Sequence, residues 1–544
     1  MIEKTIKGIK YLLDEENLTA VVIYKRGYEG DIIIPETVVF QKVAYHVTSI
    51  GGWAFEKCSS LTSIVIPDGV TSIGRTAFAG CKSLTSIVIP DSVTSIGSGA
   101  FEGCDSLKQD PTQEIEMSNF KYKLLMHNHL AMVLGYSGRS ATINIPSEIN
   151  HEGVIYRVTS IGESAFKYCS SLTSIVIPDG VTSIGEQAFY DCSSLTSIVI
   201  PDSVTSIGKE AFRDCSSLTT SIVIPDGVTS IGMWAFYNCS SLTSIVIPES
   251  VTSIGRGAFK GCSSLTSVVV AEGNTMYDSR EQCNAIIHTA TNTLISGCQN
   301  TIIPDSVTSI GEDAFSGCKS LTSIVIGNGV TSIGHCAFRG CSSLTSIVIG
   351  NGVTSIGECA FEVCTSLTSV VIPESVTSIG QSAFRGCKFT SIVIPNGVTT
   401  IGQDAFYGCE SLTSIVIPDG VMSIETFTFR LCSSLTSIVI GNGVTSIGYE
   451  AFYGCESLTS IVIGNGVTSI KENAFYGCKS LTSIVIPESV MSIGKGVFDR
   501  CRYLTSMAFN GTIAQWKGIE LGYDWNSYVP ARVIHCTDGE VEIN

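Results

Sequence analysis

The chain has 544 residues, and its hydrophobic fraction of 44% excludes an intrinsically disordered protein. Only 15% of the residues are charged, and 49 acidic residues against 32 basic ones give a net charge of −17. This acidic excess argues against a nucleic-acid partner, because no basic surface is left to replace the counterions of the phosphates.

Residues 1–46 are expected to form an N-terminal leader or cap. Lys4, Lys7 and Lys10 are followed by Asp14 and Glu15, where the apolar core of a signal peptide would lie. The sequence therefore indicates no secretion signal. It also contains no apolar run of the ~18 residues that a membrane span requires.

From residue 47 onward, a 23-residue motif dominates the sequence. One copy, Leu61–Cys81, reads LTSIVIPDGVTSIGRTAFAGC, and the cysteine that ends the motif marks 17 copies. They fall into three runs, of three copies in 47–107, five in 158–270 and nine in 304–506. An extra threonine, Thr219–Thr220, lengthens one copy. Repetition at this period is typical of a solenoid, not of three or four separate domains.

The segments between the runs are of a different kind. Residues 108–157 are a second leader, because Tyr122–Cys169 matches Tyr11–Cys58 at an offset of 111 residues. Residues 271–303 form a long-repeat insert, and residues 507–544 form a C-terminal cap. The offset indicates that a block of leader and array was duplicated.

Each copy predicts one coil of a right-handed β-solenoid or superhelix. In Leu61–Ile66, β-branched residues alternate with period two, which favours a short strand that Pro67–Gly69 ends. Val70–Ile73 predicts a second extended piece, and Ala77–Cys81 predicts a short 3₁₀ or helical turn. The expected interior columns are Leu61, Ile64, Ile66, Val70, Ile73, Ala77, Phe78, Cys81 and their equivalents.

The pattern LxxIxIPxxVTSIGxxAFxxC resembles the BspA-like (treponemal-type) leucine-rich repeat family. Asn284–Ile287, Gln515–Trp516 and His535–Asp538 also resemble segments that accompany this repeat. The resemblance implies a leucine-rich-repeat solenoid at the cell surface or secreted. It implies adhesion and ligand binding and does not imply an enzyme.

The outer side of the strand column is the candidate ligand-binding face. It presents a serine and then a valine, as in Ser63, Val65, Ser174, Val176, Ser197, Val199, Ser437 and Val439. A contiguous stripe of this kind favours an interaction surface. The leading interpretation is a monomeric, non-enzymatic protein that binds host or neighbouring-cell proteins. The alternative is a spacer or stalk without a ligand, which is consistent with the variable pairs, such as Met233–Trp234, lying on the turn side instead.

The 17 repeat cysteines are interpreted as buried free thiols, because stacked equivalents have parallel Cα–Cβ vectors that fit a disulfide poorly. Two other pairs are left open. Cys336 and Cys359, beside His335, are read as variable surface residues, with a zinc site or a disulfide as the alternative. Cys283 and Cys298 could close a loop of 15 residues if the protein is exported.

No catalytic residue and no cofactor is predicted. Gly327–Val330 lacks the lysine of a phosphate loop, and His535–Asp538 lies too close together in sequence to form a triad. His127 and His129 alone are a weak metal pattern. A weak calcium site is the one metal hypothesis, because carboxylate oxygens repeat in consecutive turns, and ordinary solvated turns are the alternative. Its residues are Asp179, Asp202, Asp226 and Glu249.

Overall fold

The computed structural model describes residues 1–107, 111–126, 128–219 and 222–543. Thr220 and His127 lie outside the described residues. The chain forms two compact units, Met1–Phe212 and Arg213–Asn544, and each is described by itself. Among the described residues, no helix has the length and apolar character that a membrane crossing requires.

Most described coils contain two short strands, and each strand pairs with the equivalent strand of a neighbouring coil within its sheet. In one coil these are Ser60–Val65 (β7) and Ser72–Ile73 (β8). Pairing is parallel and in register, with Ser63 opposite Ser86 and Ile73 opposite Ile96. Two strand columns therefore run along each array, and the hydrogen bonds of their strands link neighbouring coils.

The first strand column carries the serine-and-valine pattern, and the second is formed by two-residue strands. In the first unit the first column also contains β9 (Ser86–Val88), β14 (Thr142–Asn144), β17 (Ser174–Val176) and β19 (Ser197–Val199). The second column there contains β10 (Ser95–Ile96), β18 (Ser183–Ile184) and β20 (Ser206–Ile207).

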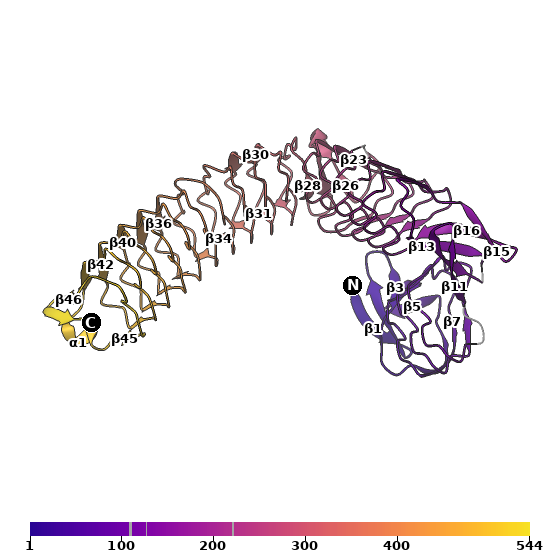
Figure 1. Ribbon diagram of the computed structural model, residues 1–544, viewed down its shortest axis with the longest axis horizontal. Coiled ribbons are helices and arrows are strands. Elements are labelled where there is room, and N and C mark those ends of the chain that lie inside the picture. Colours follow the sequence, from indigo (N-terminus) through magenta and orange to yellow (C-terminus); the bar gives the residue numbers. More distant parts are fainter. Residues whose placement is uncertain (108–110, 127, 220–221, 544) are drawn as a thin grey trace. The chain divides into compact units, whose positions relative to one another are not determined.

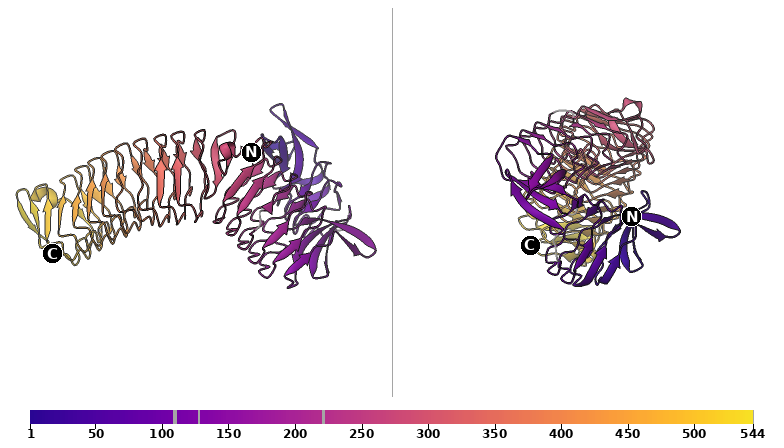
Figure 2. Two further views of the ribbon diagram at one scale, coloured as in Figure 1. Left: turned by 90° about the horizontal axis from the view of Figure 1, so that it is seen from above. Right: turned by 90° about the vertical axis from the view of Figure 1, so that its right-hand side faces the viewer.

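The second unit repeats both columns over more coils, and its array is curved (Figures 1 and 2). Its first column contains β21 (Ile222–Val223), β23 (Ser244–Ile247), β25 (Ser267–Val270), β30 (Ser323–Ile326), β32 (Ser346–Ile349), β36 (Ser414–Ile417), β38 (Ser437–Ile440), β40 (Ser460–Val462), β42 (Ser483–Ile486) and β44 (Ser506–Phe509). Its second column contains β22 (Ser230–Ile231), β24 (Ser253–Ile254), β29 (Ser309–Ile310), β31 (Ser332–Ile333), β33 (Ser355–Ile356), β34 (Ser378–Ile379), β35 (Thr400–Ile401), β37 (Ser423–Ile424), β39 (Ser446–Ile447), β41 (Ser469–Ile470) and β43 (Ser492–Ile493).

The predicted interior columns are confirmed. Leu61, Ile64, Ile66, Val70, Ile73, Ala77, Phe78 and Cys81 are each at most 2% exposed. The phenylalanine rings of consecutive coils stack almost parallel. Phe361, for example, lies 5.3 Å from Phe338 and 5.4 Å from Phe384 between ring centroids. From Phe315 to Phe498, a continuous ladder of stacked phenylalanine rings thus lies inside the array.

The segment that ends each coil differs from the predicted helical turn. Two tight turns form it, closed by hydrogen bonds from Ala77 N to Gly74 O (3.3 Å) and from Cys81 N to Phe78 O (3.1 Å). The third residue of each turn has a positive φ, 50° at Thr76 and 74° at Gly80. Because a left-handed residue interrupts the right-handed helical conformation, no described coil contains a 3₁₀- or α-helix.

The two leaders share one strand order. The first contains β1 (Ile2–Ile6), β2 (Ile9–Asp14), β3 (Thr19–Val22), β4 (Glu29–Ile33), β5 (Thr37–Phe40) and β6 (Val43–Ile50). The second contains β11 (Thr112–Met117), β12 (Phe120–Leu125), β13 (Leu130–Tyr136), β14, β15 (Glu148–His151) and β16 (Val154–Ile161). In each, a three-stranded antiparallel sheet pairs in parallel with the last strand, which begins the second column. Tyr11 and Tyr122, which the offset aligns, are both 1% exposed.

The second leader also covers the last coil of the first run. Leu125 and Leu130 belong to the hydrophobic core of the first leader and first run. The Nζ of Lys123 donates to Gly97 O at 2.9 Å, and the Nδ2 of Asn128 donates to Val93 O at 3.0 Å. One leader therefore closes one array and begins the next.

The insert leaves the second unit's array uninterrupted. It contains β26 (Tyr277–Asp278), the 3₁₀ turn η1 (Arg280–Gln282), β27 (Ala285–His288) and β28 (Thr293–Gly297). Gly261 N donates to Ser316 O at 2.9 Å, so the coil of Cys318 rests directly on the coil of Cys262.

The C-terminal segment covers the last coil, near the C label in Figure 1. It contains helix α1 (Ile513–Trp516), β45 (Glu520–Leu521), β46 (Val533–Cys536) and β47 (Gly539–Glu542). Thr512 and Gln515 form a capping box at the start of α1. Trp525 packs edge-on against Phe498, with ring centroids 6.2 Å apart, and so ends the aromatic ladder.

Candidate functional site

The first strand column of the second unit carries a row of exposed valines, here called the valine stripe. Exposure ranges from 40% at Val439 to 78% at Val371. Isoleucines on the other side of the strand, such as Ile324, face the core. The stripe consists of Val223, Val246, Val269, Val325, Val348, Val371, Val393, Val416, Val439, Val462 and Val485.

Strand register aligns the valines within separate ladders, among them β21–β23–β25, β30–β32 and β36–β38–β40, and Val371 and Val393 lie between the last two. Val325 lies opposite Val348, and Val416 lies opposite Val439, so neighbouring valines are separated by one strand spacing of about 4.8 Å. In Figure 1, β30, β36, β40 and β42 follow the outer edge of the curved unit, and β31 and β34 follow the inner edge. The valine stripe therefore occupies the convex side.

The serine and valine residues predicted for this face lie on it. Ser63, Val65, Ser174, Ser197 and Ser437 are partly exposed, and Val176, Val199 and Val439 are exposed. At the leader end of the first unit, Asp31 covers the column. Its Oδ1 accepts hydrogen bonds from Ser63 (2.6 Å) and Thr62 (2.8 Å), which lower the pKa of the Asp31 carboxyl.

The concave side has a different chemistry. A groove of about 460 Å³ runs along the second column, and its lining includes hydroxyl residues such as Ser355 and Thr400, the apolar Ile356 and Met422, and the carboxylate of Glu425. No titratable nucleophile with a neighbouring base lines it among the described residues. This groove offers shape and hydroxyl groups but no catalytic arrangement.

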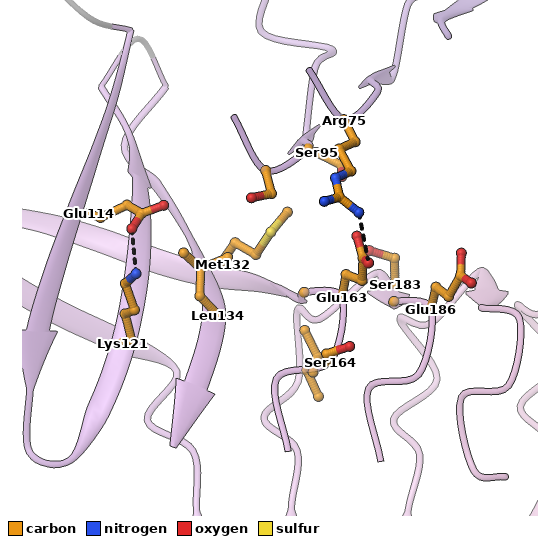
Figure 3. Close-up of a pocket in the computed structure, with 15 residues that line it drawn as sticks. Arg75, Ser95, Glu114, Lys121, Met132, Leu134, Glu163, Ser164, Ser183 and Glu186 are labelled. Carbon is orange, nitrogen blue, oxygen red and sulfur yellow. Dashed lines mark ion pairs between the residues drawn. The ribbon is translucent and has the colours of Figure 1, made fainter. Parts of the chain in front are cut away.

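The first unit has a cavity of about 450 Å³ between the first run and the second leader (Figure 3). Arg75 pairs with Glu163 at 3.8 Å, and Lys121 pairs with Glu114 at 2.6 Å. Figure 3 shows these pairs on separate sides of Met132 and Leu134. Glu186, which also lines the cavity, pairs with Lys209 outside it at 2.8 Å, so each charged group of the lining has an ion-pair partner.

The turn side of the second unit carries a column of cationic and aromatic side chains that the sequence analysis missed. Arg385 lies over the ring of Tyr407 at 4.6 Å, and Arg430 lies over Tyr453 at 4.4 Å. Tyr453 stacks on Tyr476 with centroids 4.7 Å apart. The pattern that could have predicted this column is the residue after each Ala-Phe, which recurs with the coil. Tyrosine and arginine are enriched at protein interfaces, so the turn side is a second candidate surface.

Cys336 and Cys359 are not variable surface residues, because Cys336 is only 3% exposed and Cys359 is partly buried. Both are thiols, and they lie beside His335. Burial raises the pKa of the Cys336 thiol. Burial and the neighbouring Glu362 carboxylate raise the pKa of the Cys359 thiol to about 12.

The four acids of the calcium hypothesis, by contrast, do not form a ligand cluster. Asp179 and Asp202 are exposed turn residues of the first unit, and Asp226 and Glu249 are exposed turn residues of the second. Within the described residues, one group of three or more His, Cys, Asp or Glu side chains has ligand atoms within 4.8 Å of one another, and these acids are not in it. The calcium site stays a prediction from sequence.

Other candidate residues have separate partners. Cys283 and Cys298 are buried thiols that donate to Ala285 O and Asn284 O, so the structure contains no bridge between them. In the C-terminal segment, the Oδ1 of Asp538 accepts from Ile513 N at 2.7 Å, and His535 pairs with Glu540.

Fifteen of the 17 repeat cysteines are buried inside the array, as predicted, and Cys104 and Cys169 are partly buried. The Sγ of Cys341 donates to Phe315 O of the preceding coil at 3.1 Å, and Cys409 and Cys501 make the same bond at 3.2 Å. Burial raises the pKa of both Cys409 and Cys501 from the ordinary value of 9.0 to about 12.

We expect the stability of the protein to fall in alkali, because unfolded thiols ionise near pH 9 while the buried thiols stay protonated. Stability is retained below pH 9 and lost as the pH rises from about 9 towards 12. Thermal unfolding in the presence of a reductant at pH 7.5, 9 and 10.5 measures this. A Cys409→Ala/Cys432→Ala variant, which removes two ionising groups, should lose less Tm between pH 7.5 and 10.5. An equal loss would contradict the explanation.

Comparison with known proteins identifies a family model and solved structures that match the chain. The model of the BspA type leucine rich repeat region matches residues 36–130, 159–283, 295–413 and 399–518. A leucine-rich repeat protein from Bacteroides ovatus is 31% identical, with 78% of this chain and 99% of that chain covered and a TM-score of 0.55.

Two further solved structures are similar at lower identity. A leucine-rich cell surface protein from Faecalibacterium prausnitzii is 26% identical, with 96% of this chain and 98% of that chain covered and a TM-score of 0.36. The pneumococcal vaccine antigen PcpA is 19% identical, with 80% and 100% covered and a TM-score of 0.41. No curated protein matches the chain.

Proposed function

Because the chain belongs to the BspA-type leucine-rich repeat family, we propose that it is a non-enzymatic protein-binding protein whose valine stripe contacts its ligands. The exposure of a valine in eleven described coils of the second unit supports this most directly, since exposed apolar residues repeated along one face favour an interaction site. We place the protein at the cell surface or outside the cell, where its ligands are host or neighbouring-cell proteins.

The energetics require a ligand that spans several coils. Covering the exposed part of one valine contributes about 1 kcal/mol. Association costs roughly 4–15 kcal/mol in lost translational and rotational freedom. A contact over one or two coils is therefore too weak, and a contact over about five coils only reaches the lower end of this cost, so the ligand must span at least about five coils. The flat, repeated stripe fits an extended protein surface better than a small molecule.

A spacer without a ligand is the second candidate, because the stripe repeats the same residues and carries no distinctive side chain. The turn side, with its arginine and tyrosine column, holds more of the variation. The two candidates differ in whether any partner binds.

A panel of purified host extracellular proteins, immobilised and probed with the full chain, tests the proposal. The stripe variant replaces Val325, Val348 and Val371 with aspartate. The matched control replaces Thr331, Thr354 and Thr377 of the same coils, which are exposed on the other strand column, with aspartate. Both variants add the same charge at the same coil spacing.

We expect the wild type to bind at least one protein of the panel, the stripe variant to bind it at least tenfold more weakly, and the control to bind normally. Equal binding by both variants would move the binding surface away from the valine stripe. The absence of any ligand in the panel would favour the spacer.

A further inference from the structure

Three metal-binding side chains from two consecutive coils converge at one point of the second unit. The Nε2 of His335 lies 3.6 Å from the Sγ of Cys336, and the ligand atoms of His335, Cys336 and Cys359 all lie within 4.8 Å of one another. Tetrahedral zinc with ordinary bond lengths separates a nitrogen and a sulfur ligand by roughly 3.5 Å and two sulfur ligands by roughly 3.8 Å. We propose that these three residues bind a zinc ion that links the two coils.

The backbone holds both cysteines in one conformation. Cys336 and Cys359 each have φ = 53°, in the left-handed region. Cys336 N donates to Glu358 O and Cys359 N donates to Gln381 O, both at 2.8 Å. Because each cysteine is tied to the coil that follows it, the two side chains point in the same direction from equivalent positions. Only small side-chain movements, of about 1 Å, are then needed to bring the ligands to zinc distances.

A carboxylate lies beside the histidine. The Nδ1 of His335 lies 2.9 Å from the Oε1 of Glu312, which Arg256 holds at 2.8 Å, and the Arg256 guanidinium lies 3.5 Å from the same Nδ1. With Nδ1 donating to this carboxylate, the lone pair of Nε2 is available to the ion. A carboxylate in this position is the usual support of a zinc-binding histidine.

Charge and ligand type also favour zinc. Two thiols that lose their protons and gain a divalent ion leave the net charge of the site unchanged. Arg339 holds the Oε2 of Glu362 at 2.7 Å, and among the described residues the group of ligand atoms within 4.8 Å of one another does not include Glu362. Two sulfurs and one imidazole select zinc over magnesium or calcium, and the fourth position is left to water.

Titration of the reduced, metal-free full chain with Co²⁺ tests the site, since cobalt bound by thiolates in tetrahedral geometry gives charge-transfer and visible d–d absorption. We expect one equivalent to bind with these bands and to be displaced by Zn²⁺. Cys336→Ser/Cys359→Ser should abolish the charge-transfer band. Glu312→Gln should weaken binding by about 10–100-fold, as loss of a supporting carboxylate does.

The chain contains a matched control. His535 and Cys536 are also adjacent, and Glu540 lies 3.0 Å from the Nδ1 of His535, yet they are not part of a three-ligand group. His535→Gln/Cys536→Ser should bind cobalt like the wild type. His335→Gln, at a partly exposed position, tests the site without removing a buried thiol. The proposal is overturned if the wild type shows no thiolate–cobalt absorption, or if the site variants and the control bind equally. Neither result bears on the valine stripe.

Discussion

Phe361→Ala is expected to lower the free energy of unfolding by about 3–5 kcal/mol. Phe361 is completely buried and is stacked on both sides, between Phe338 and Phe384. Each coil contacts only its neighbours, so the array cannot fill the cavity by rearranging around it. Urea unfolding followed by circular dichroism measures the loss, and hydrogen exchange of the flanking strands locates it.

The control for this prediction is a valine of the stripe. Val371 is 78% exposed, and Val371→Ala should change stability by less than about 0.5 kcal/mol. If both variants lose the same free energy of unfolding, the phenylalanine ladder does not contribute the stability assigned to it.

Asp313→Ala is expected to cost about 1.5–3 kcal/mol, because it removes a buried carboxylate that accepts two charged hydrogen bonds from partly exposed cations. The Asp313 side chain is 1% exposed and pairs with Lys260 at 2.7 Å and with Arg256 at 3.2 Å. Both cations belong to the last coil before the insert, and Asp313 belongs to the first coil after it. The substitution therefore weakens the junction on which the continuity of the array depends.

Glu410→Ala is the matched control, since Glu410 forms an exposed ion pair with Lys388 between consecutive coils. Exposed pairs contribute about 0.2–1 kcal/mol, so this variant should unfold almost like the wild type. Urea unfolding of the two variants measures the loss of unfolding free energy in each. A smaller loss of unfolding free energy for Asp313→Ala than for Glu410→Ala would contradict the stabilising role of Asp313 at this junction.

Much of the fold could be predicted because the coils share one repeated sequence motif. Period-two alternation placed Ile64 and Ile66 inside and Val65 outside, and the structure agrees. The turns could not be predicted in the same way. Glu210, Trp234 and Glu450 all have positive φ at the same position of the coil, although none of these residue types favours it strongly. The spacing of Ala, Phe and Cys fits a helical turn equally well, so neither composition nor spacing distinguished the two.

The cluster of His335, Cys336 and Cys359 also could not be fully predicted from the sequence. The sequence placed Cys336 and Cys359 in equivalent positions of neighbouring coils, which implies a separation of about 4.8 Å. It did not show that the left-handed turn buries Cys336, or that Glu312 of the preceding coil reaches His335. Side-chain direction depends on backbone conformation, and that conformation was the part of the coil predicted incorrectly.

Hydrogen–deuterium exchange of the full chain, free and bound to a protein ligand, tests the central claim that the convex valine stripe is the binding surface. We expect protection in the Ser-Ile-Val-Ile strands of about five or more consecutive coils, because fewer coils do not offset the cost of association. Protection confined to the turn side around Arg430 and Tyr453, or to the concave strand column, would contradict it.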